Sequence, residues 1–327
     1  MRRANNLVAE VADIDNLRPA FWKARKGKSY AWEVRRYGRD LEQNLRRLQE
    51  QILDGNVETG RYRFFKIFDP KERRICAPAF EEQVLHHALM NICHPFFEHA
   101  QIFDSYACRK GKGTYAALAR ARIYTRRYRF FLKLDVQKFF DSIHHGALKN
   151  QLHRLIKDHW VLTVFYQLID SYRSDGNEGR GVPIGNLGSQ YFANHYLSGL
   201  DHFIKETLKI RAYVRYMDDM ILWHDDKNVL KNARRAVQDF VETYLQCVLK
   251  PPLLNYCSRG IPFLGYLVFP YYLRLSQRSK KRFIRKWQDL QEKYDTGAWG
   301  EAECRRHALP LLAFTQHADA KYFRKKI

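Results

Sequence analysis

The stretch Tyr216-Met217-Asp218-Asp219 lies between two short apolar runs, 212–216 and 220–223. β-Branched, aromatic and other apolar residues dominate both runs, a composition typical of strands packed in a sheet. The pattern predicts a hairpin with two carboxylates at its tip. Adjacent acids repel each other there unless a cation neutralises them, and Mg²⁺ prefers carboxylate oxygens. The pair Asp225-Asp226 lacks this setting and is interpreted as a solvated loop.

A third carboxylate follows another strand that is expected to be buried. The segment 130–134 is Phe-Phe-Leu-Lys-Leu, and Asp135 comes next. If this strand lies beside the hairpin, Asp135 meets Asp218 and Asp219 at one edge of the sheet. Three acids there can hold two metal ions roughly 3.5–4 Å apart, the arrangement used for in-line phosphoryl transfer. The protein then contributes positioning and charge compensation rather than covalent chemistry.

Motifs along most of the chain, in this order and spacing, resemble those of the reverse transcriptase family. Residues 134–143 are similar to its first palm motif, 216–219 (YMDD) to its catalytic turn, and 263–265 to the motif before the thumb. Residues 105–113 resemble the fingers motif of bacterial retroelement and intron enzymes, and 70–75 the basic fingers segment that contacts the triphosphate. The resemblance implies an α+β right-hand polymerase fold, with fingers, a palm whose antiparallel sheet packs on helices, and a short helical thumb.

The sequence of the loop 181–190 indicates which subfamily of reverse transcriptases the chain resembles most. Most bacterial reverse transcriptases have Gln-Gly and then Ser-Pro there, whereas this chain has Ile184-Gly185 and Ser189-Gln190. Together with Ser258-Arg259-Gly260, this resembles the enzymes of diversity-generating retroelements, which are related to group II intron and retron enzymes. Those enzymes copy an RNA template with adenine-directed errors, in the process called mutagenic retrohoming. One segment departs from the family pattern, because Glu82-Gln83 and His86 replace the usual Asp-Arg and Gln. The sequence therefore does not predict whether these positions make the contacts that they make in the family.

The resemblance also implies a set of site residues. Three catalytic acids would bind two Mg²⁺ ions, for which Mn²⁺ can substitute, and a backbone carbonyl would complete a metal shell: Asp135, Asp218, Asp219 and the carbonyl of Val136. Nucleotide contacts are expected from Lys71, Arg73, Arg74, Phe140, Ile184 and Gly185. Template and primer contacts are expected from Arg109, Lys112, Gln190, Tyr216, Met217, Gly265, Arg278, Lys281 and Arg282.

Two of these assignments have a structural alternative. Phe140 lies where the family places an aromatic ring beneath the incoming sugar, but it could instead be a core phenylalanine, as we expect Phe139 to be. Ile184 stands where most relatives have a glutamine near the nascent base pair. It could instead pack the loop, as apolar loop residues usually do.

Composition agrees with a nucleic-acid enzyme. The chain has 327 residues, of which 46% are apolar, enough for a large core and more than one domain. The 57 Lys and Arg residues against 35 Asp and Glu give a net charge of +22, which favours a polyanionic partner. A merely soluble basic protein is the alternative. The six cysteines form no Cys-x-x-Cys pair, so neither a zinc site nor a disulfide scaffold is expected. We expect a soluble, cytoplasmic protein, because no signal peptide or apolar run of about 20 residues is evident. The resemblance implies a bacterial, archaeal or phage origin.

The organisation expected is 1–122 for the N-terminal extension and fingers, 123–275 for the palm with part of the fingers inserted, and 276–327 for a short thumb. Apolar periodicity predicts a helix over 40–53. The aromatic composition of 62–68 predicts a strand, and a helix is expected from 80 that ends near Pro95. A long helix is expected to open at Ser189. From Ser276 a helix with one basic and one apolar face is predicted, which could follow a phosphate backbone or be merely solvated. No RNase H or endonuclease domain is expected after it.

Other features are interpreted more modestly. Residues 109–114 do not have the spacing of a phosphate loop and are interpreted as a basic fingers turn. The pairs His86-His87 and His144-His145 point in different directions on a helix and are not expected to bind a metal. Five arginines between 120 and 129 could bind template or form a solvated face.

The predicted function is that of an RNA-directed DNA polymerase that makes cDNA from RNA template, primer and dNTPs, with the enzyme of a diversity-generating retroelement as the subclass. The reverse transcriptase of a retron or phage-defence system is the alternative, and a non-catalytic RNA-binding scaffold is a further one. By resemblance we expect a small, basic, helical and oligomeric accessory variability protein as partner.

Overall fold

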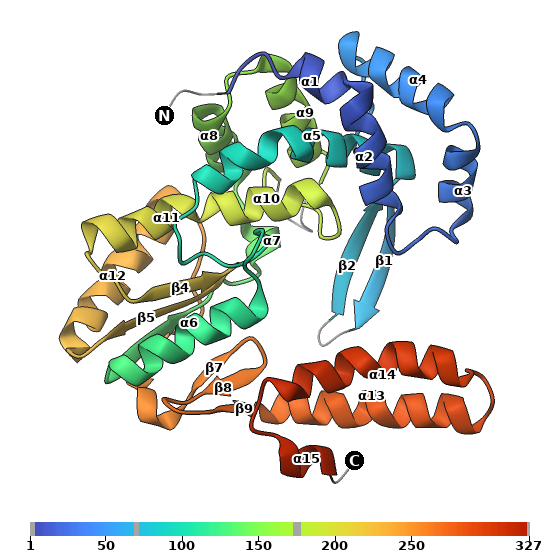
Figure 1. Cartoon of the computed structure of the whole chain (residues 1–327). Coiled ribbons are helices and arrows are strands. Elements are labelled where there is room, and N and C mark those ends of the chain that lie inside the picture. The colour runs from blue at the N-terminus through green and yellow to red at the C-terminus, as the bar shows by residue number, and fades with distance from the viewer. Residues whose placement is uncertain (1–3, 69–71, 173–177, 326–327) are drawn as a thin grey trace. The chain divides into compact units, whose positions relative to one another are not determined.

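The computed structural model describes residues 4–68, 72–172 and 178–325, so Lys71 lies outside the described residues (Figure 1). The chain forms two compact units, each made of segments distant in sequence. Unit 1 comprises Met1–Phe103, Val136–Phe203 and Val237–Leu249. Unit 2 comprises Asp104–Asp135, Ile204–Ala236 and Lys250–Ile327.

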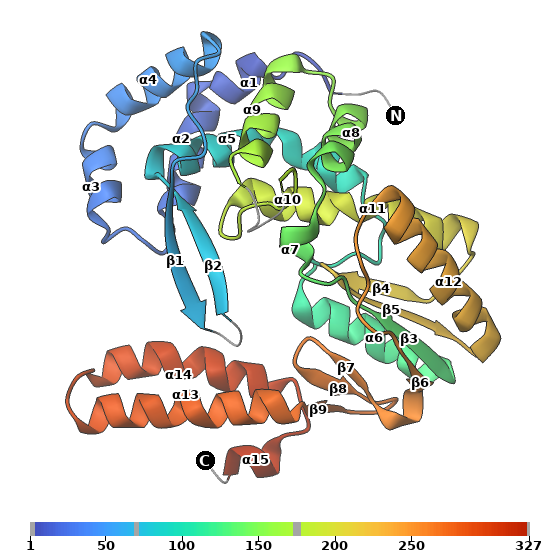
Figure 2. The ribbon, with the colours of Figure 1, turned by 180° about the vertical axis from the view of Figure 1, so that it is seen from behind.

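Unit 1 is mainly helical, with one projecting hairpin (Figures 1 and 2). The hairpin pairs β1 (Tyr62–Phe68) with β2 (Glu72–Pro78) in antiparallel register, and β1 has the bounds expected from its aromatic composition. The predicted helix over 40–53 is confirmed, and Leu45, Leu48 and Ile52 are buried on one face. The helices are α1 (Val8–Ala12), α2 (Ile14–Arg25), α3 (Trp32–Arg39), α4 (Leu41–Leu53), α5 (Phe80–His99), α7 (Phe139–Ser142), α8 (His145–Leu155), α9 (His159–Asp170), α10 (Leu187–Tyr196) and α11 (Ser198–His202).

Unit 2 is built on a four-stranded antiparallel sheet in the order β4-β5-β3-β6. The helix α6 (Thr114–Arg127) packs on this sheet, and the core between them contains Tyr124, Phe131 and Trp223. This confirms the α+β class with an antiparallel sheet packed on a helix. The strands are β3 (Phe130–Leu134), β4 (Tyr213–Tyr216), β5 (Asp219–His224) and β6 (Leu253–Tyr256).

A second sheet and a helical hairpin complete unit 2. The three-stranded sheet contains β7 (Ile261–Phe263), β8 (Tyr266–Val268) and β9 (Leu273–Leu275). Then come α13 (Gln277–Asp295), α14 (Glu301–Gln316) and α15 (Lys321–Lys325). The helix α12 (Lys227–Tyr244) contains the boundary between the two units.

Two predicted helix boundaries were wrong. The helix expected to end near Pro95 continues to His99 with the proline inside it. Proline cannot donate a hydrogen bond to the carbonyl four residues earlier, but packing after it compensates: the buried Phe97 ring lies 5.4 Å from Tyr191 and 6.1 Å from Phe165.

The helix expected to open at Ser189 begins two residues earlier and is interrupted. Asn186 is its N-cap, because the side chain of Asn186 accepts a hydrogen bond from the backbone N–H of Gly188 at 2.9 Å. The segment then divides at Leu197 into α10 and α11, and a short π-helix follows over Phe203–Thr207. Phe192, Tyr196 and Leu200 are nevertheless buried as expected, whereas Phe203 is only half-buried.

The C-terminal amphipathic helix is confirmed as α13. Ser276 caps it, accepting a hydrogen bond from the N–H of Ser279 at 3.1 Å. Phe283 and Leu290 are buried on its apolar face. Among the described residues, no helix combines the length and apolar character that a membrane crossing needs.

Candidate active site

The two adjacent acids lie at a tight turn between β4 and β5. Tyr216 pairs with Asp219 across the hairpin, and Met217 at its tip has a positive φ of 54°. The buried Arg215 donates a hydrogen bond from Nη1 to the carbonyl of Met217 at 3.2 Å. Its backbone N–H donates to the Asp104 carbonyl at 3.0 Å, and its carbonyl accepts from the N–H of Tyr106 at 2.9 Å. These bonds hold the turn and its two carboxylates in place.

The third acid reaches the same sheet edge, as the sequence predicted. β3 pairs with β5 so that Leu134 lies opposite Met220, which places Asp135 beside the hairpin tip. Burial and repulsion from Asp135 raise the pKa of Asp218 to about 7. Burial also raises the pKa of Asp219 to about 6, although Lys133 opposes that shift. Asp218 and Asp219 therefore lie at a poorly solvated edge of the sheet at which their negative charges are unfavourable.

Two lysines, which the sequence did not single out, neutralise part of this charge. Lys250 Nζ donates to Asp135 Oδ1 at 2.6 Å. Lys133 Nζ donates to Asp219 Oδ2 at 3.1 Å and to the carbonyl of Pro262 at 2.6 Å. No local pattern marks Lys250, because its partner is 115 positions away in the chain.

The residues fit a divalent cation by their chemistry. Hard carboxylate oxygens are the donors, and Oδ1 of Asp219 is buried without a hydrogen bond even though Lys133 Nζ lies 3.0 Å from it. Within the described residues, no three His, Cys, Asp or Glu side chains are already arranged around a common point as a metal shell. In this arrangement, two of the three carboxylates hold lysine ammonium groups instead.

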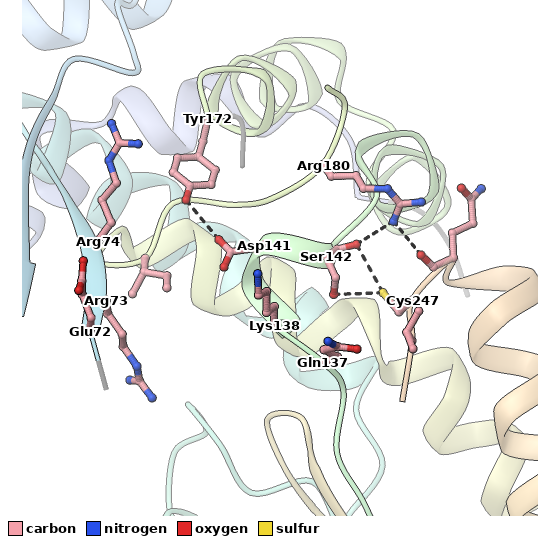
Figure 3. Close-up of a pocket in the computed structure, with 13 residues that line it drawn as sticks. Glu72, Arg73, Arg74, Gln137, Lys138, Asp141, Ser142, Tyr172, Arg180 and Cys247 are labelled. Atoms are coloured by element: carbon pink, nitrogen blue, oxygen red, sulfur yellow. Dashed lines mark hydrogen bonds between the residues drawn. The ribbon is translucent and has the colours of Figure 1, made fainter. Parts of the chain in front are cut away.

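Unit 1 contains a basic cavity of about 490 Å³ (Figure 3). Its lining includes four basic residues, Arg73 and Arg74 of β2 together with Lys138 and Arg180, and two acids, Glu72 and Asp141. The predicted nucleotide residues Arg73, Arg74 and Ile184 all line it. Basic side chains outnumber acidic ones in this lining, which favours a polyanionic ligand such as a polyphosphate.

Fixed hydrogen bonds shape the wall of the cavity. Arg180 Nη1 donates to the carbonyl of Gln246 at 2.7 Å and to that of Ser142 at 3.1 Å. The hydroxyl of Tyr172 donates to Asp141 Oδ1 at 3.3 Å, and burial raises the pKa of Tyr172. Lys138 has a left-handed backbone, with φ 46° and ψ 49°, where it begins α7. The Lys138 side chain is exposed and lines the cavity, so its ammonium group can reach a ligand there.

Ile184 and Gly185 hold the 181–190 loop against β2. The Ile184 carbonyl accepts a hydrogen bond from the N–H of Cys76 at 2.7 Å. Gly185 has a φ of 108°, and a Cβ there would lie 2.8 Å from Ile75 Cγ2 and 3.0 Å from the Cys76 carbonyl oxygen. Only glycine fits this close approach without strain. The Ile184 side chain is half-buried and lines the cavity.

A scan against protein-family models decides the family. Residues 69–268 match the model described as reverse transcriptase (RNA-dependent DNA polymerase).

The chain belongs to the reverse transcriptase family.

Similar curated proteins include intron-encoded ones. The putative COX1/OXI3 intron 2 protein of Saccharomyces cerevisiae is 22% identical, over 62% of this reverse transcriptase chain and 32% of that protein. Protein YkfC of Escherichia coli is 24% identical, over 61% and 54% respectively. Nuclear intron maturase 1 of Arabidopsis thaliana is 25% identical, over 42% and 18%. The chain thus spans between about a fifth and half of the length of these relatives.

Solved structures show the same fold. Apo telomerase of Candida tropicalis superposes with a TM-score of 0.51 at 13% identity, covering 71% of this chain and 52% of that one. At this identity the likeness concerns the fold alone, and it confirms the right-hand polymerase class expected of a reverse transcriptase.

The other predicted contacts of this reverse transcriptase are spread over both units. In unit 2, Arg109 Nη1 donates to the Ser105 carbonyl at 2.9 Å, and Lys112 Nζ lies 4.8 Å from the Tyr106 ring centre. Gly265 has a φ of 89°, and its carbonyl accepts a hydrogen bond from the hydroxyl of Ser279. In unit 1, Gln190 is exposed on α10. The predicted basic stripe on α13 is exposed: Arg278, Lys281 and Arg282.

Several residues that the sequence left open have structural roles. Glu82 and His86, where the chain departs from the family pattern, are buried on α5, and Glu82 Oε1 accepts from the Gly60 N–H at 3.0 Å. Arg120, the first of the arginine cluster, donates to the buried Asp104 at 2.9 Å. The exposed Asp225 and Asp226 form the solvated loop that their setting predicted.

Proposed function

We propose that this chain is an RNA-directed DNA polymerase that synthesises cDNA at Asp135, Asp218 and Asp219. The observation that supports this most strongly is the meeting of these three carboxylates at one edge of an antiparallel sheet, where the pKa values of Asp218 and Asp219 are raised. Ionised carboxylates in this setting lower the stability of the folded protein, and pKa values raised in this way are typical of functional sites. Family membership supports the same chemistry.

The three carboxylates and the carbonyl of Val136 would hold divalent cations, which we propose to be two Mg²⁺ ions. When bound, such ions stabilise the charge that develops on the attacking and leaving oxygens. The protein's own part is to aim the carboxylates through the Arg215-held turn. Lys133 and Lys250 offset part of the negative charge of these carboxylates.

The cavity in unit 1 would receive the triphosphate. Arg73, Arg74 and Lys138 are exposed cations that can pair with its oxygens, and Lys71 would join them from outside the described residues.

Exposed Arg278, Lys281 and Arg282 on α13 would contact the phosphates of template and primer without reading sequence. We also propose that 1–122 form the N-terminal extension and fingers, 123–275 the palm with part of the fingers inserted, and 276–327 a short thumb.

Within the family, we propose the error-prone enzyme of a diversity-generating retroelement. Ile184-Gly185 in place of Gln-Gly supports this subclass, and the Ile184 side chain lines the cavity rather than the core. Isoleucine offers shape but neither donor nor acceptor, so a mispair there loses no hydrogen bond relative to a correct pair. A retron or phage-defence enzyme shares this chemistry, and a template repeat with a variable copy in a nearby gene would separate the two.

Replacing Ile184 with glutamine should lower misincorporation, most of all opposite template adenines, while polymerisation continues. A discriminating hydrogen bond worth about 1 kcal/mol changes an error ratio roughly fivefold. The measurement is sequencing of cDNA made by both enzymes on one RNA. Leu187→Gln makes the same chemical change in the same loop at a half-buried position outside the cavity lining, and it should leave the spectrum unchanged. An unchanged adenine error rate in Ile184→Gln would remove the mutagenic role from this residue.

The partner we propose is a small, basic, helical accessory protein that helps hold the RNA. The purified chain alone should then extend an annealed primer weakly, and should need the partner and a structured RNA to make its own cDNA. Primer extension with and without the partner measures this. Robust, template-specific synthesis by the isolated chain would contradict the requirement.

A further inference from the structure

Three large aromatic side chains are exposed where α2 turns into α3. Trp22, Tyr30 and Trp32 are 52%, 73% and 65% exposed. Neighbouring aromatic residues already fill the core: Phe21 is 2% exposed and stacks on Tyr37 with ring centres 5.8 Å apart. Most of the surface of these three rings therefore lies outside the core, although Trp22 also contacts Phe21 edge-on with ring centres 5.1 Å apart. Exposed apolar rings gathered in one place are typical of an interaction site. We call residues 22–36 the α2–α3 corner; it lies entirely in unit 1 (Figure 2).

The α2–α3 corner is also strongly basic. It contains six Lys or Arg residues and one acid, Glu33. Glu33 lies 3.8 Å from Arg63 of β1, so this acid is already shared with a basic residue. The ammonium groups of Lys23 and Lys28 bond the neutral amides of Asn91 and Gln83, which leaves their charge uncompensated by those partners.

Cations and rings alternate within the corner. The guanidinium carbon of Arg25 lies 5.1 Å from the Trp22 ring centre, and that of Arg36 lies 5.7 Å from the ring centre of Trp32. An arginine beside an indole offers a flat face for a base and a charge for its phosphate. Residues 26–31 connect the two pairs without regular helix, and Gly27 in this turn has a φ of 77°.

We propose that the α2–α3 corner is a docking surface for single-stranded RNA, separate from the three carboxylates of unit 2. Bases would stack on Trp22, Trp32 and Tyr30, while Arg25, Lys26 and Arg36 pair with phosphates. The charge argues against a basic protein as the occupant, because like charges would face each other. Double-stranded RNA is disfavoured because its bases are stacked within the helix, where these rings do not reach them.

The test uses the full chain and a fluorescent oligo-uridine RNA of about 16 nucleotides, the upper range of known single-strand sites. Binding is measured by anisotropy across a salt series without nucleotides. Trp22→Ala/Trp32→Ala should weaken binding about tenfold or more, since each lost stack is worth a large factor. Trp22→Phe/Trp32→Phe keeps the rings and should restore most of the affinity. Arg25→Gln/Lys26→Gln should reduce the salt slope by about 1.4, which is about 0.7 for each phosphate contact to a single strand.

Matched controls come from α12. Tyr244→Ala removes an aromatic residue that is 65% exposed, and Arg234→Gln/Arg235→Gln removes two exposed arginines. Both should bind the RNA as the unaltered chain does. Thermal melting should be unchanged in the tryptophan variants, and primer extension on the same preparations reports on the polymerase independently.

Unchanged RNA affinity in Trp22→Ala/Trp32→Ala would overturn the proposal. Equal losses of affinity for single-stranded and for duplex RNA would also overturn it, since they would indicate that the surface binds phosphates by charge and does not stack on bases. Loss of accessory-protein binding with RNA binding intact would assign the surface to a protein instead. A loss confined to single-stranded RNA, restored by the phenylalanines, would support it.

Discussion

Replacing Asp218 with asparagine is expected to lower polymerisation by at least about 10³-fold with RNA binding largely intact, in line with electrostatic terms in catalysis. The amide keeps the shape of the side chain but removes the charge that would bind a cation. Primer extension measures the loss, and filter binding of RNA measures what remains. Asp225→Asn, the same change in a solvated acid next to the same strand, should have near-normal activity. Near-normal activity in Asp218→Asn would contradict the assigned site.

The same substitution should stabilise the metal-free protein. Burial and repulsion from Asp135 raise the pKa of Asp218 to about 7 in the folded chain. At a pH above the ordinary pKa of an aspartate, this carboxyl is therefore ionised to a greater extent in the unfolded chain than in the folded one, which favours unfolding. The resulting penalty grows as pH rises from about 4 towards 7 and is full above that. Asparagine removes this penalty, so melting in EDTA at pH 8 should occur at a higher temperature than for the unaltered chain, by a few degrees. The gain should vanish near pH 4.

The catalytic edge was predictable because local sequence patterns determine most of it. Apolar runs of strand length flank 217–219, and the strand before Asp135 needs a partner, so an antiparallel sheet brings the acids together. The observed register of Leu134 with Met220 agrees. The α13 cap and stripes were likewise encoded within a few turns of one helix.

What could not be predicted depends on contacts distant in sequence. Lys250 meets Asp135 across 115 positions, and nothing near it indicates a role. The cavity wall joins Arg180 to Gln246 and Tyr172 to Asp141 in the same way. The Pro95 error has a related cause, because the packing of Phe97 outweighs a local helix-breaking signal.

The two phenylalanines after Asp135 differ in their surroundings. Phe139 is 4% exposed and belongs to the core, as expected. Phe140 is half-buried, and its ring meets that of Phe139 edge-on at 5.9 Å. Its carbonyl accepts a hydrogen bond from the N–H of Val182 at 2.9 Å, which fixes the backbone at this point. The Phe140 ring is thus held in place without being required in the core.

Phe140→Ala should raise ribonucleotide incorporation, because the ring would clash with a 2′-hydroxyl on the incoming sugar and offers it no acceptor. A steric conflict of about 1–3 kcal/mol corresponds to roughly 5- to 150-fold in discrimination. Primer extension with mixed rNTPs and dNTPs, followed by alkaline cleavage, measures the ratio. Phe139→Ala is the matched control: it should unfold at lower temperature, by a loss of about 3–5 kcal/mol, without changing sugar choice in the folded fraction. Equal sugar discrimination in Phe140→Ala and the unaltered chain would show that this ring does not contact the sugar, and would leave Phe140 as a packing residue beside Phe139.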